Sequence, residues 1–481
     1  MNEYKIFVQR VGLVGITNIL IAISSLILLP IITKNFSITD YGIWVQINTT
    51  IGLITIISTL GLPFTMVRFL SVEKDKKTIQ EGFYSIASIV LVSCLFISII
   101  IVLFSNSIAS ALFNDNINLT ILLSIIVFFA SLNGLLINYF RTFNQMKRYS
   151  IFYIFQTYFG VLIVSYIAIS GFGIYYAALG LLIANFITFI IMFSFIISNI
   201  GFKIPKLKNT KEYLSFGLPL IPSNLSFWVV DSIDRYVIGI ILGLSFVGYY
   251  TPGYTLGNMI VMILAPFSLL LPSILPEYYE QHNIKKVKIY LKYSLKCYLL
   301  IAIPAAFGLS ILSKPILLIL TNPEISSNGY FITPFIAFSM LLFGVYGIIS
   351  NILVLRKKTG LIGIIWILVA VLNLILNMML VPFFGIIGAA IVTFIAYVIA
   401  FTLTHIYSIK YIKFTYDLPF IFKSIAASIL MSIIIVINNP EGILSLLTTI
   451  IISIFVYLIF LVLFKGIDNK EVKFMKEIFG L

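Results

Sequence analysis

Long apolar runs alternate with short polar segments along almost the whole chain. Each run holds about 20 residues, which is enough for an α-helix to cross roughly 30 Å of hydrocarbon. Fourteen such runs lie at 11–33, 42–66, 82–104, 119–140, 150–170, 173–198, 214–241, 247–275, 290–312, 329–354, 360–381, 384–408, 418–437 and 442–464. The pattern predicts an all-α integral membrane protein with about fourteen transmembrane helices.

The composition supports this class and excludes several others. Of 481 residues, 60% are hydrophobic and 10% charged, and the mean hydropathy is +1.12; a soluble protein of this size needs far more polar surface. The first run, Val11 to Ile32, is longer than a signal-peptide core and has no cleavage site after it, so we expect it to be retained. Two cysteines and two scattered histidines predict neither a metal site nor a disulfide.

The basic residues predict the orientation of the chain. With a cytoplasmic N-terminus, 28 of the 31 Lys and Arg residues fall in cytoplasmic segments, Lys34 and Lys314 fall outside, and Arg235 lies within a span. Cytoplasmic loops of membrane proteins carry such an excess. We therefore expect a multi-pass protein of the cell membrane with both termini in the cytoplasm. The net charge of +14 then reflects topology and contact with anionic lipid, and we expect no nucleic-acid partner.

Short matches suggest that one unit of six spans occurs twice. Thr17-Asn18 corresponds to Ser223-Asn224 and Gly42 to Gly248, both at an offset of 206, and FGIYYAALG (172–180) corresponds to FGIIGAAIV (384–392) at 212. Two such units are typical of transporters. We predict six-helix lobes at 1–199 and 200–412 around a central cavity, and an appended helix pair with a cytoplasmic tail at 413–481.

Three charges interrupt one apolar run, in SFWVVDSIDRYVIGIILG (226–243). Helical spacing places Asp231, Asp234 and Arg235 on one face, with Asn224 on nearly the same stripe. Charges at membrane depth are expensive and usually face a cavity or each other. In a functional interpretation, the cluster binds an anionic headgroup or titrates during transport. In a structural interpretation, it is an ion pair that stabilises its own helix. The pattern leaves both interpretations open.

Other polar residues within or beside spans are weaker candidates. Arg68 ends the second span, like Arg10 and Arg141 at other span ends, and is either a positive-inside anchor or a ligand. Asparagines in spans either join helices or line a cavity, and Asn373 and Asn377 share one helix face. The asparagine candidates for a cavity are Asn18, Asn258, Asn373 and Asn377. Trp44 and Trp228 are candidates for stacking on sugar rings, and His405 is expected at the membrane interface.

The stretch 213–254 resembles Wzx-type polysaccharide flippases of the MATE-like exporter superfamily. The matching residues are Gly217, Pro219, Asn224-Leu225, Asp234-Arg235-Tyr236 and Gly248-Tyr249, and residues 33–44 and 61–71 also resemble the family. The resemblance implies a flippase, not an enzyme, that moves a polyprenyl-diphosphate-linked oligosaccharide to the outer leaflet. It implies that Arg235 and Arg68 meet the diphosphate, with no cofactor, a proton or sodium gradient as a candidate energy source, and polysaccharide polymerase machinery as a candidate partner.

Two alternatives remain. A cation-coupled multidrug antiporter of the same superfamily usually carries an acid in its first span; none lies between Val11 and Ile32, although Asp231 and Asp234 can replace it. A membrane polymerase needs a large outer loop or an interfacial His/Asp pair, and the longest outer segments, 105–118 and 313–328, are short and lack histidine.

Overall fold

The computed structural model describes residues 2–466, with side chains from residue 12 onward. Within these residues the chain forms helices and short connections and contains no strand, which confirms the predicted all-α class. Contacts divide the chain into two compact units, 1–248 and 249–481, which are described separately. These units are defined by packing, so the lobe boundaries expected from the repeat stay a prediction.

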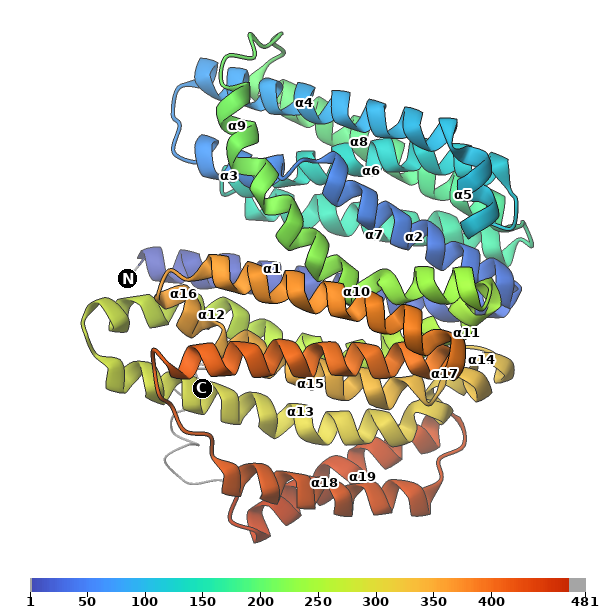
Figure 1. The fold of residues 1–481 in the computed structure, drawn as a ribbon, viewed down its shortest axis with the longest axis vertical. Coiled ribbons are helices and arrows are strands. Elements are labelled where there is room, and N and C mark those ends of the chain that lie inside the picture. Colours follow the sequence, from blue (N-terminus) through green and yellow to red (C-terminus); the bar gives the residue numbers. More distant parts are fainter. Residues whose placement is uncertain (1, 467–481) are drawn as a thin grey trace. The chain divides into compact units, whose positions relative to one another are not determined.

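The first unit is built from long apolar helices joined by short turns (Figure 1). Its elements are α1 (Asn2–Asn35), α2 (Ile38–Ser58), α3 (Leu62–Leu70), α4 (Lys76–Leu103), α5 (Ser105–Leu112), α6 (Ile117–Thr142), α7 (Met146–Ile169), α8 (Ile174–Ile200), α9 (Thr210–Gly217), the 3₁₀ turn η1 (Leu218–Leu220), α10 (Ile221–Ile241) and the start of α11 (Leu244–Asn258). Side chains accept hydrogen bonds from free N–H groups where three of the helices begin: Ser37 caps α2, Asp75 caps α4 and Asn116 caps α6.

Helix α6 lies at the centre of this unit. It packs against α2, α3, α4 and α8, while α1 packs against α7 and α10 packs against α2. A core of apolar and aromatic side chains from α3, α4, α6, α8 and α9 fills the space between them, including the fully buried Leu62, Phe83 and Phe140.

The second unit is a bundle of helices. Its elements after α11 are α12 (Val261–Glu280), α13 (Ile284–Leu320), α14 (Pro323–Gly329), α15 (Ile332–Ile349), α16 (Asn351–Leu355), α17 (Thr359–Ile409), α18 (Leu418–Asn438) and α19 (Gly442–Leu463). Helix α15 packs against α17 and α13, α13 packs in turn against α18, and α18 pairs with α19. The two C-terminal helices, drawn in red in Figure 1, thus cover one side of α13.

The apolar runs correspond to helices, with informative differences. Within residues 2–466, thirteen helices are long and apolar enough to cross a membrane. One of them, α17, is two helices joined at Gly385, whose φ of 60° and ψ of −145° are not helical; its 51 residues would extend about 77 Å as one helix, far more than a bilayer needs. Counting its halves separately gives the fourteen spans that the sequence predicts.

Two predicted spans contain breaks that hydropathy does not reveal. The run 42–66 is divided between α2 and α3, because Gly61 takes a left-handed φ of 69° that favours glycine. The run 247–275 is divided between α11 and α12 near Met259. Both connections are apolar, so a hydropathy pattern continues through them.

Two segments that match at the offset of 206 pack against each other within the first unit. A Cβ atom added at Gly42 would overlap the carbonyl oxygen of Leu244, and one at Gly248 would lie 2.7 Å from the carbonyl oxygen of Ile38. The hydroxyls of Thr39 and Ser245, equivalent positions at this offset, lie 2.8 Å apart. Such reciprocal contact is the signature of a two-fold arrangement, and it supports the repeat in this region.

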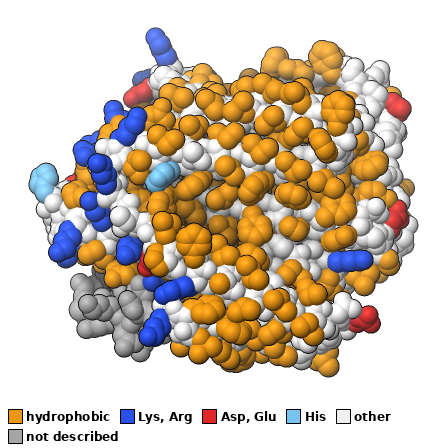
Figure 2. All heavy atoms as spheres, turned by 60° about the horizontal axis from the view of Figure 1, so that its bottom comes forward, with side chains coloured by type: hydrophobic (Ala, Val, Ile, Leu, Met, Phe, Trp, Pro, Cys, Tyr) orange, Lys and Arg blue, Asp and Glu red, His pale blue; other side chains and the backbone are white. Residues whose placement is uncertain are grey.

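The surface of the second unit is apolar over a broad face. Figure 2 shows one face of the molecule that is covered by hydrophobic side chains, with most of its Lys and Arg side chains gathered at one end. Helices α18 and α19 contribute many of the exposed apolar side chains, among them Ile437, Leu444 and Phe455. A face of this kind in water would be unusual for a monomer, and it marks a multi-pass membrane protein.

Candidate functional site

The three intramembrane charges lie near the middle of α10, after a site where the sequence predicts a break. Pro219 and Pro222 suggest an interruption because proline removes a helical hydrogen bond. The structure has a 3₁₀ turn there: α9 ends at Gly217, η1 follows, and α10 begins at Ile221, while the backbone stays right-handed helical.

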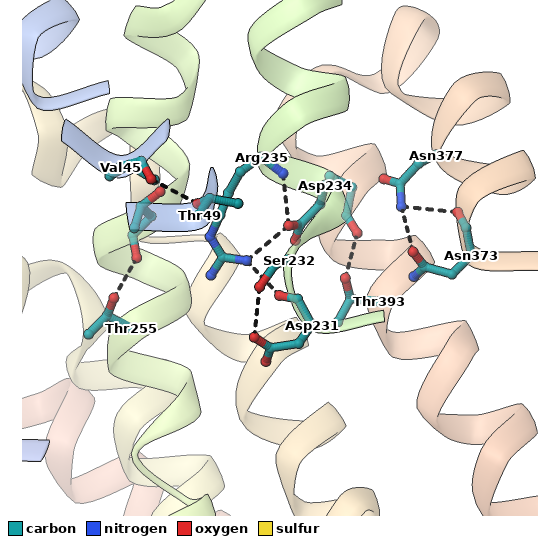
Figure 3. A network of polar contacts seen from close by, with 12 residues as sticks. Val45, Thr49, Asp231, Ser232, Asp234, Arg235, Thr255, Asn373, Asn377 and Thr393 are labelled. Atoms are coloured by element: carbon teal, nitrogen blue, oxygen red, sulfur yellow. Dashed lines mark hydrogen bonds and ion pairs between the residues drawn. The ribbon is translucent and has the colours of Figure 1, made fainter. Parts of the chain in front are cut away.

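Arg235 is held by groups on its own helix (Figure 3). Its Nη1 atom donates to Asp234 Oδ1 at 3.0 Å and to the backbone carbonyl oxygen of Asp231 at 2.5 Å. Both members of the ion pair are buried, Asp234 at 1% exposure and Arg235 at 8%. Of the two carboxylates on this face, Asp234 forms the ion pair with Arg235.

Asp231 is half-buried and plays a different part. Its carboxylate accepts a hydrogen bond from the Ser232 hydroxyl at 2.9 Å, while its backbone carbonyl oxygen accepts one from Arg235 Nη1. The predicted common face of Asp231, Asp234 and Arg235 is therefore present.

Helix α2 fixes the backbone beneath this pair. Gln46, which is fully buried, donates from Nε2 to the backbone oxygen of Arg235 at 2.7 Å. One residue further along α10, the Tyr236 hydroxyl lies 2.7 Å from that of Thr50. The charged pair thus lies on a helix that is hydrogen-bonded to α2. A movement of the α10 backbone at Arg235 would break these hydrogen bonds.

The other candidates of the first unit are not gathered around Arg235. Arg68 lies on α3, which packs against α4, α6 and α9 rather than α10; its side chain is exposed and has no hydrogen-bond or ion-pair partner in the described part of the chain. Asn18 is exposed on α1 and Asn224 is half-buried on α10, and neither amide is hydrogen-bonded within residues 2–466. These are side chains with unused hydrogen-bonding capacity.

The candidates of the second unit include one buried amide pair. Asn377 Nδ2 donates to the side-chain oxygen of Asn373 at 3.1 Å and to its backbone oxygen at 3.0 Å (Figure 3). Asn373 Nδ2 and Asn377 Oδ1 are buried without a partner in the described structure, an unusual situation for amide groups. Asn258, near the end of α11, is half-buried.

Other polar residues join helices or pack in the interior. Asn133 donates to the backbone oxygen of Asn185 at 2.9 Å, so it links α6 to α8. Trp44 and Trp228 are buried within the first unit, and the Trp228 ring lies 5.9 Å from that of Tyr236. Neither indole ring is exposed enough to stack on a sugar in this conformation. Among the described residues, no group of three His, Cys, Asp or Glu side chains is placed to hold a metal ion.

Sequence reasoning assigned Gln46 and Thr50 no part in the charged site. Gln46 is a polar residue within an apolar run, and its hydrogen-bond partner lies 189 positions away. Thr50 carries no signal of its own, because threonines within spans commonly bond their own helix, as this one does to Gln46 O at 2.7 Å.

Comparison with known proteins gives two family matches. The model of a family described as polysaccharide biosynthesis protein matches residues 7–275, more than half of the chain, and the MatE model matches residues 219–379. Together these two ranges include α10 and its charged face.

Two curated relatives come from Haloferax volcanii. The chain is 27% identical over 218 residues to the probable low-salt glycan biosynthesis flippase Agl15, covering 45% of this chain and 46% of that one. It is 29% identical over 178 residues to the probable flippase AglR, covering 36% and 37%. The chain therefore aligns with less than half of the length of each relative.

Solved structures match over nearly the full chain. The lipid II flippase MurJ in an inward closed conformation matches with a TM-score of 0.77 at 19% identity, covering 95% of this chain and 98% of that one. An inward-facing MATE family multidrug resistance transporter of the MOP superfamily matches with a TM-score of 0.63 at 16% identity, covering 81% and 94%. At these identities the likeness establishes a shared fold.

Proposed function

Because the chain belongs to the polysaccharide biosynthesis protein family, we propose that it is a flippase for a polyprenyl-diphosphate-linked oligosaccharide. It would carry this lipid from the inner to the outer leaflet of the cell membrane for the synthesis of a surface polysaccharide. The observation that carries the proposal is the family match over residues 7–275. Relatives named as glycan flippases and the fold shared with a lipid II flippase support it.

The residues allow a division of roles between the two arginines. A diphosphate is best held by cations that donate hydrogen bonds. Arg68 is exposed and has no partner in the described part of the chain, so its guanidinium is available to an anionic headgroup. Arg235 is already paired with Asp234, and substrate would have to displace that carboxylate. We therefore assign the first contact with the diphosphate to Arg68, and to Arg235 a contact made only after α10 rearranges.

The asparagines are proposed as glycan contacts. Asn18, Asn224 and Asn258 carry amides without hydrogen bonds in the described structure, and sugar hydroxyls are suitable partners. The buried pair of Asn373 and Asn377 has one donor and one acceptor to spare. Energy from a proton or sodium gradient, orientation with both termini in the cytoplasm, and cooperation with a polysaccharide polymerase belong to the same proposal.

A second function is favoured by one specific observation. The MatE model matches residues 219–379, and multidrug resistance transporters share the fold, so a cation-coupled drug antiporter is the alternative. The first span carries no acidic residue between Val11 and Ile32, which leaves Asp231 and Asp234 as the groups for ion coupling. Asp234 is already paired with Arg235. It would have to leave this ion pair in order to bind a coupling ion, which disfavours the antiporter.

Depletion of the protein in its native cell distinguishes these functions. A flippase predicts that lipid-linked oligosaccharide accumulates on the inner leaflet, where a membrane-impermeant glycosidase cannot reach it in intact cells. Accumulation on the outer leaflet would indicate a polymerase instead. Increased drug sensitivity with unchanged lipid-linked oligosaccharide would indicate the antiporter and contradict the proposal.

A further inference from the structure

A cavity lies at the end of α17, within the second unit and far in sequence from the charged face of α10. Its volume is about 630 Å³, within the roughly 300–1,000 Å³ usual for small-molecule sites. It is lined by the last turn of α17 and by the linker 410–417 that leads to α18. The lining residues used below are His405, Ile409, Lys410, Lys413, Thr415 and Tyr416.

The linker is held against the protein so that its polar side chains face outward. Ile412 and Phe414 are buried. Lys413, which lies between them, and Thr415, which follows Phe414, are exposed. This alternation is that of an extended segment lying on an apolar surface. The position of Lys413 at the mouth of the cavity is thus set by its buried neighbours.

The far end of the linker is fixed to α17 by a hydrogen bond. Tyr416 OH lies 2.6 Å from His405 Nδ1, and the two rings lie 5.2 Å apart. Burial raises the pKa of the Tyr416 hydroxyl, so the phenol keeps its proton. When this hydroxyl donates to Nδ1, the neutral imidazole carries its own proton on Nε2, which makes His405 a further hydrogen-bond donor.

Among the residues that the structure describes, no neighbouring acid neutralises the positive charge at this cavity. Within residues 2–466 no carboxylate lies in ion-pair distance of Lys410 or Lys413. The acid next to the cavity, Asp417, is bound to Lys296 Nζ at 3.0 Å and caps α18. Lys410 lies over the Tyr407 ring, with Nζ 4.9 Å from the centroid, a contact that leaves its N–H groups able to bind an anion.

The walls of the cavity are apolar where the lysines are absent. Ile406, Ile409 and Leu418 line it, and Ile406 and Leu418 are 44% and 56% exposed. A free phosphate ion gains nothing from such a wall, whereas a lipid places its phosphate on the cations and its first methylene groups on the isoleucines. The combination of donors and apolar walls favours an amphiphile.

From this geometry we propose that the cavity formed by His405, Lys410, Lys413 and Tyr416 binds the phosphate headgroup of an anionic phospholipid. The basic-residue census predicts that this end of α17 faces the cytoplasm, which is where anionic lipids concentrate. The bound lipid would fix the linker between α17 and α18. This is a structural lipid site, distinct from the residues assigned above to the transported substrate.

Native mass spectrometry of the purified full-length protein tests the site. Phosphatidylglycerol is titrated against the wild type, the pair Lys410→Ala/Lys413→Ala, and the matched pair Lys357→Ala/Lys358→Ala. The control lysines are likewise exposed and follow α16 at a predicted cytoplasmic turn. We expect the first pair to weaken binding by about tenfold, because two charges next to the phosphate are lost, and the control pair to change it by less than about twofold.

Further arms identify the source of the phosphate. Phosphatidylcholine should bind weakly and equally to all three proteins, and millimolar inorganic phosphate should not displace phosphatidylglycerol. Equal weakening by both lysine pairs, or unchanged binding in the first, would overturn the proposal; displacement by inorganic phosphate would replace the lipid by a soluble ion. If the double variant does not fold, Lys413→Gln and Tyr416→Phe provide the same comparison, and both must weaken binding.

Discussion

At the scale of single residues, the ion pair of Asp234 and Arg235 determines what each substitution on α10 will do. Both side chains are buried, so removing one partner leaves an uncompensated charge in a low-dielectric site, whereas removing both does not. The pair is therefore expected to matter for stability before it matters for transport, and the two effects have to be separated by design.

Arg235→Ala is expected to destabilise the protein by about 3–5 kcal/mol, because the buried carboxylate of Asp234 loses the guanidinium that neutralises it. The double variant Asp234→Asn/Arg235→Gln should recover most of that loss, since neither residue is then charged. Thermal unfolding of the purified protein in detergent measures both. Equal unfolding temperatures for Arg235→Ala and the wild type would show that the pair carries no stability.

Arg68→Ala is expected to lower transport by about tenfold without changing the unfolding temperature. The side chain is exposed and has no partner in the described structure, so its loss affects only a charge-assisted contact to substrate. Arg141→Ala is the matched control, an exposed arginine at the end of α6. If both variants lose transport equally, Arg68 acts only as one more positive charge at the membrane surface.

The charged face of α10 was partly predictable from the sequence. Helical spacing was sufficient to place Asp231, Asp234 and Arg235 on one face. It was not sufficient to choose between the two carboxylates, because side-chain rotamers decide that choice and Arg235 pairs with its immediate neighbour. The hydrogen bond from Gln46 joins residues 189 positions apart and depends on how α2 packs against α10.

At the scale of elements, close backbone contacts and helix caps connect segments that are distant in sequence. The reciprocal contact of Gly42 and Gly248 joins the start of α2 to the start of α11. The ion pair of Lys296 and Asp417 joins α13 to the start of α18. Each contact supports one prediction.

Gly42→Ala is expected to destabilise the first unit, because its Cβ would overlap the carbonyl oxygen of Leu244 and a backbone atom cannot move aside cheaply. Gly248→Ala should act in the same direction and less strongly, at 2.7 Å from the carbonyl oxygen of Ile38. Gly12→Ala, with open space around its Cβ position, is the control. Thermal unfolding compares the three, and a Gly42→Ala protein as stable as the control would contradict the close contact.

Asp417 should make the α13–α18 connection sensitive to acid. Burial alone would raise its pKa, but hydrogen bonds from Lys296 and from the backbone of Phe420 outweigh this and hold the pKa below its usual value. Its contribution to stability is therefore complete above the pKa of the unfolded carboxyl, about 3.9, and is lost as the pH falls through the lower folded value.

Unfolding temperatures measured from pH 6 to pH 3 test this contribution. Asp417→Asn should be less stable than the wild type at pH 6, and the difference should shrink in acid. Glu441→Gln, which removes an exposed carboxylate, should leave the wild-type profile unchanged. A constant difference between Asp417→Asn and the wild type at every pH would show that the charge of Asp417 is not involved.

The helices themselves were predictable, and their interruptions were less so. Apolar runs near 20 residues indicated the spans because membrane thickness imposes that length. The breaks near Gly61 and Met259 lie in apolar sequence, where hydropathy carries no signal. The 3₁₀ turn before α10 lies where a distortion was predictable, because Pro219 and Pro222 cannot donate helical backbone hydrogen bonds.

At the scale of the whole molecule, the protein is a multi-pass membrane protein that belongs to the polysaccharide biosynthesis protein family and shares its fold with the lipid II flippase MurJ. The family resemblance was visible in residues 213–254, and the match over residues 7–275 confirms it. The identity of the glycan was not predictable, because sugar-binding sites consist of dispersed polar residues whose partners depend on packing. Asn18, Asn224 and Asn258 illustrate this, since nothing in their sequence context specifies a sugar.

Translocation in proteoliposomes is the decisive test of the proposed flippase activity. The lipid-linked oligosaccharide that accumulates on depletion is extracted, fluorescently labelled on the glycan and reconstituted with the purified protein. The account predicts that a membrane-impermeant quencher reaches a growing share of the label in vesicles containing the wild type, and that Arg68→Ala slows this by about tenfold while Arg141→Ala does not. Vesicles with folded wild-type protein that expose label no faster than protein-free vesicles would contradict it.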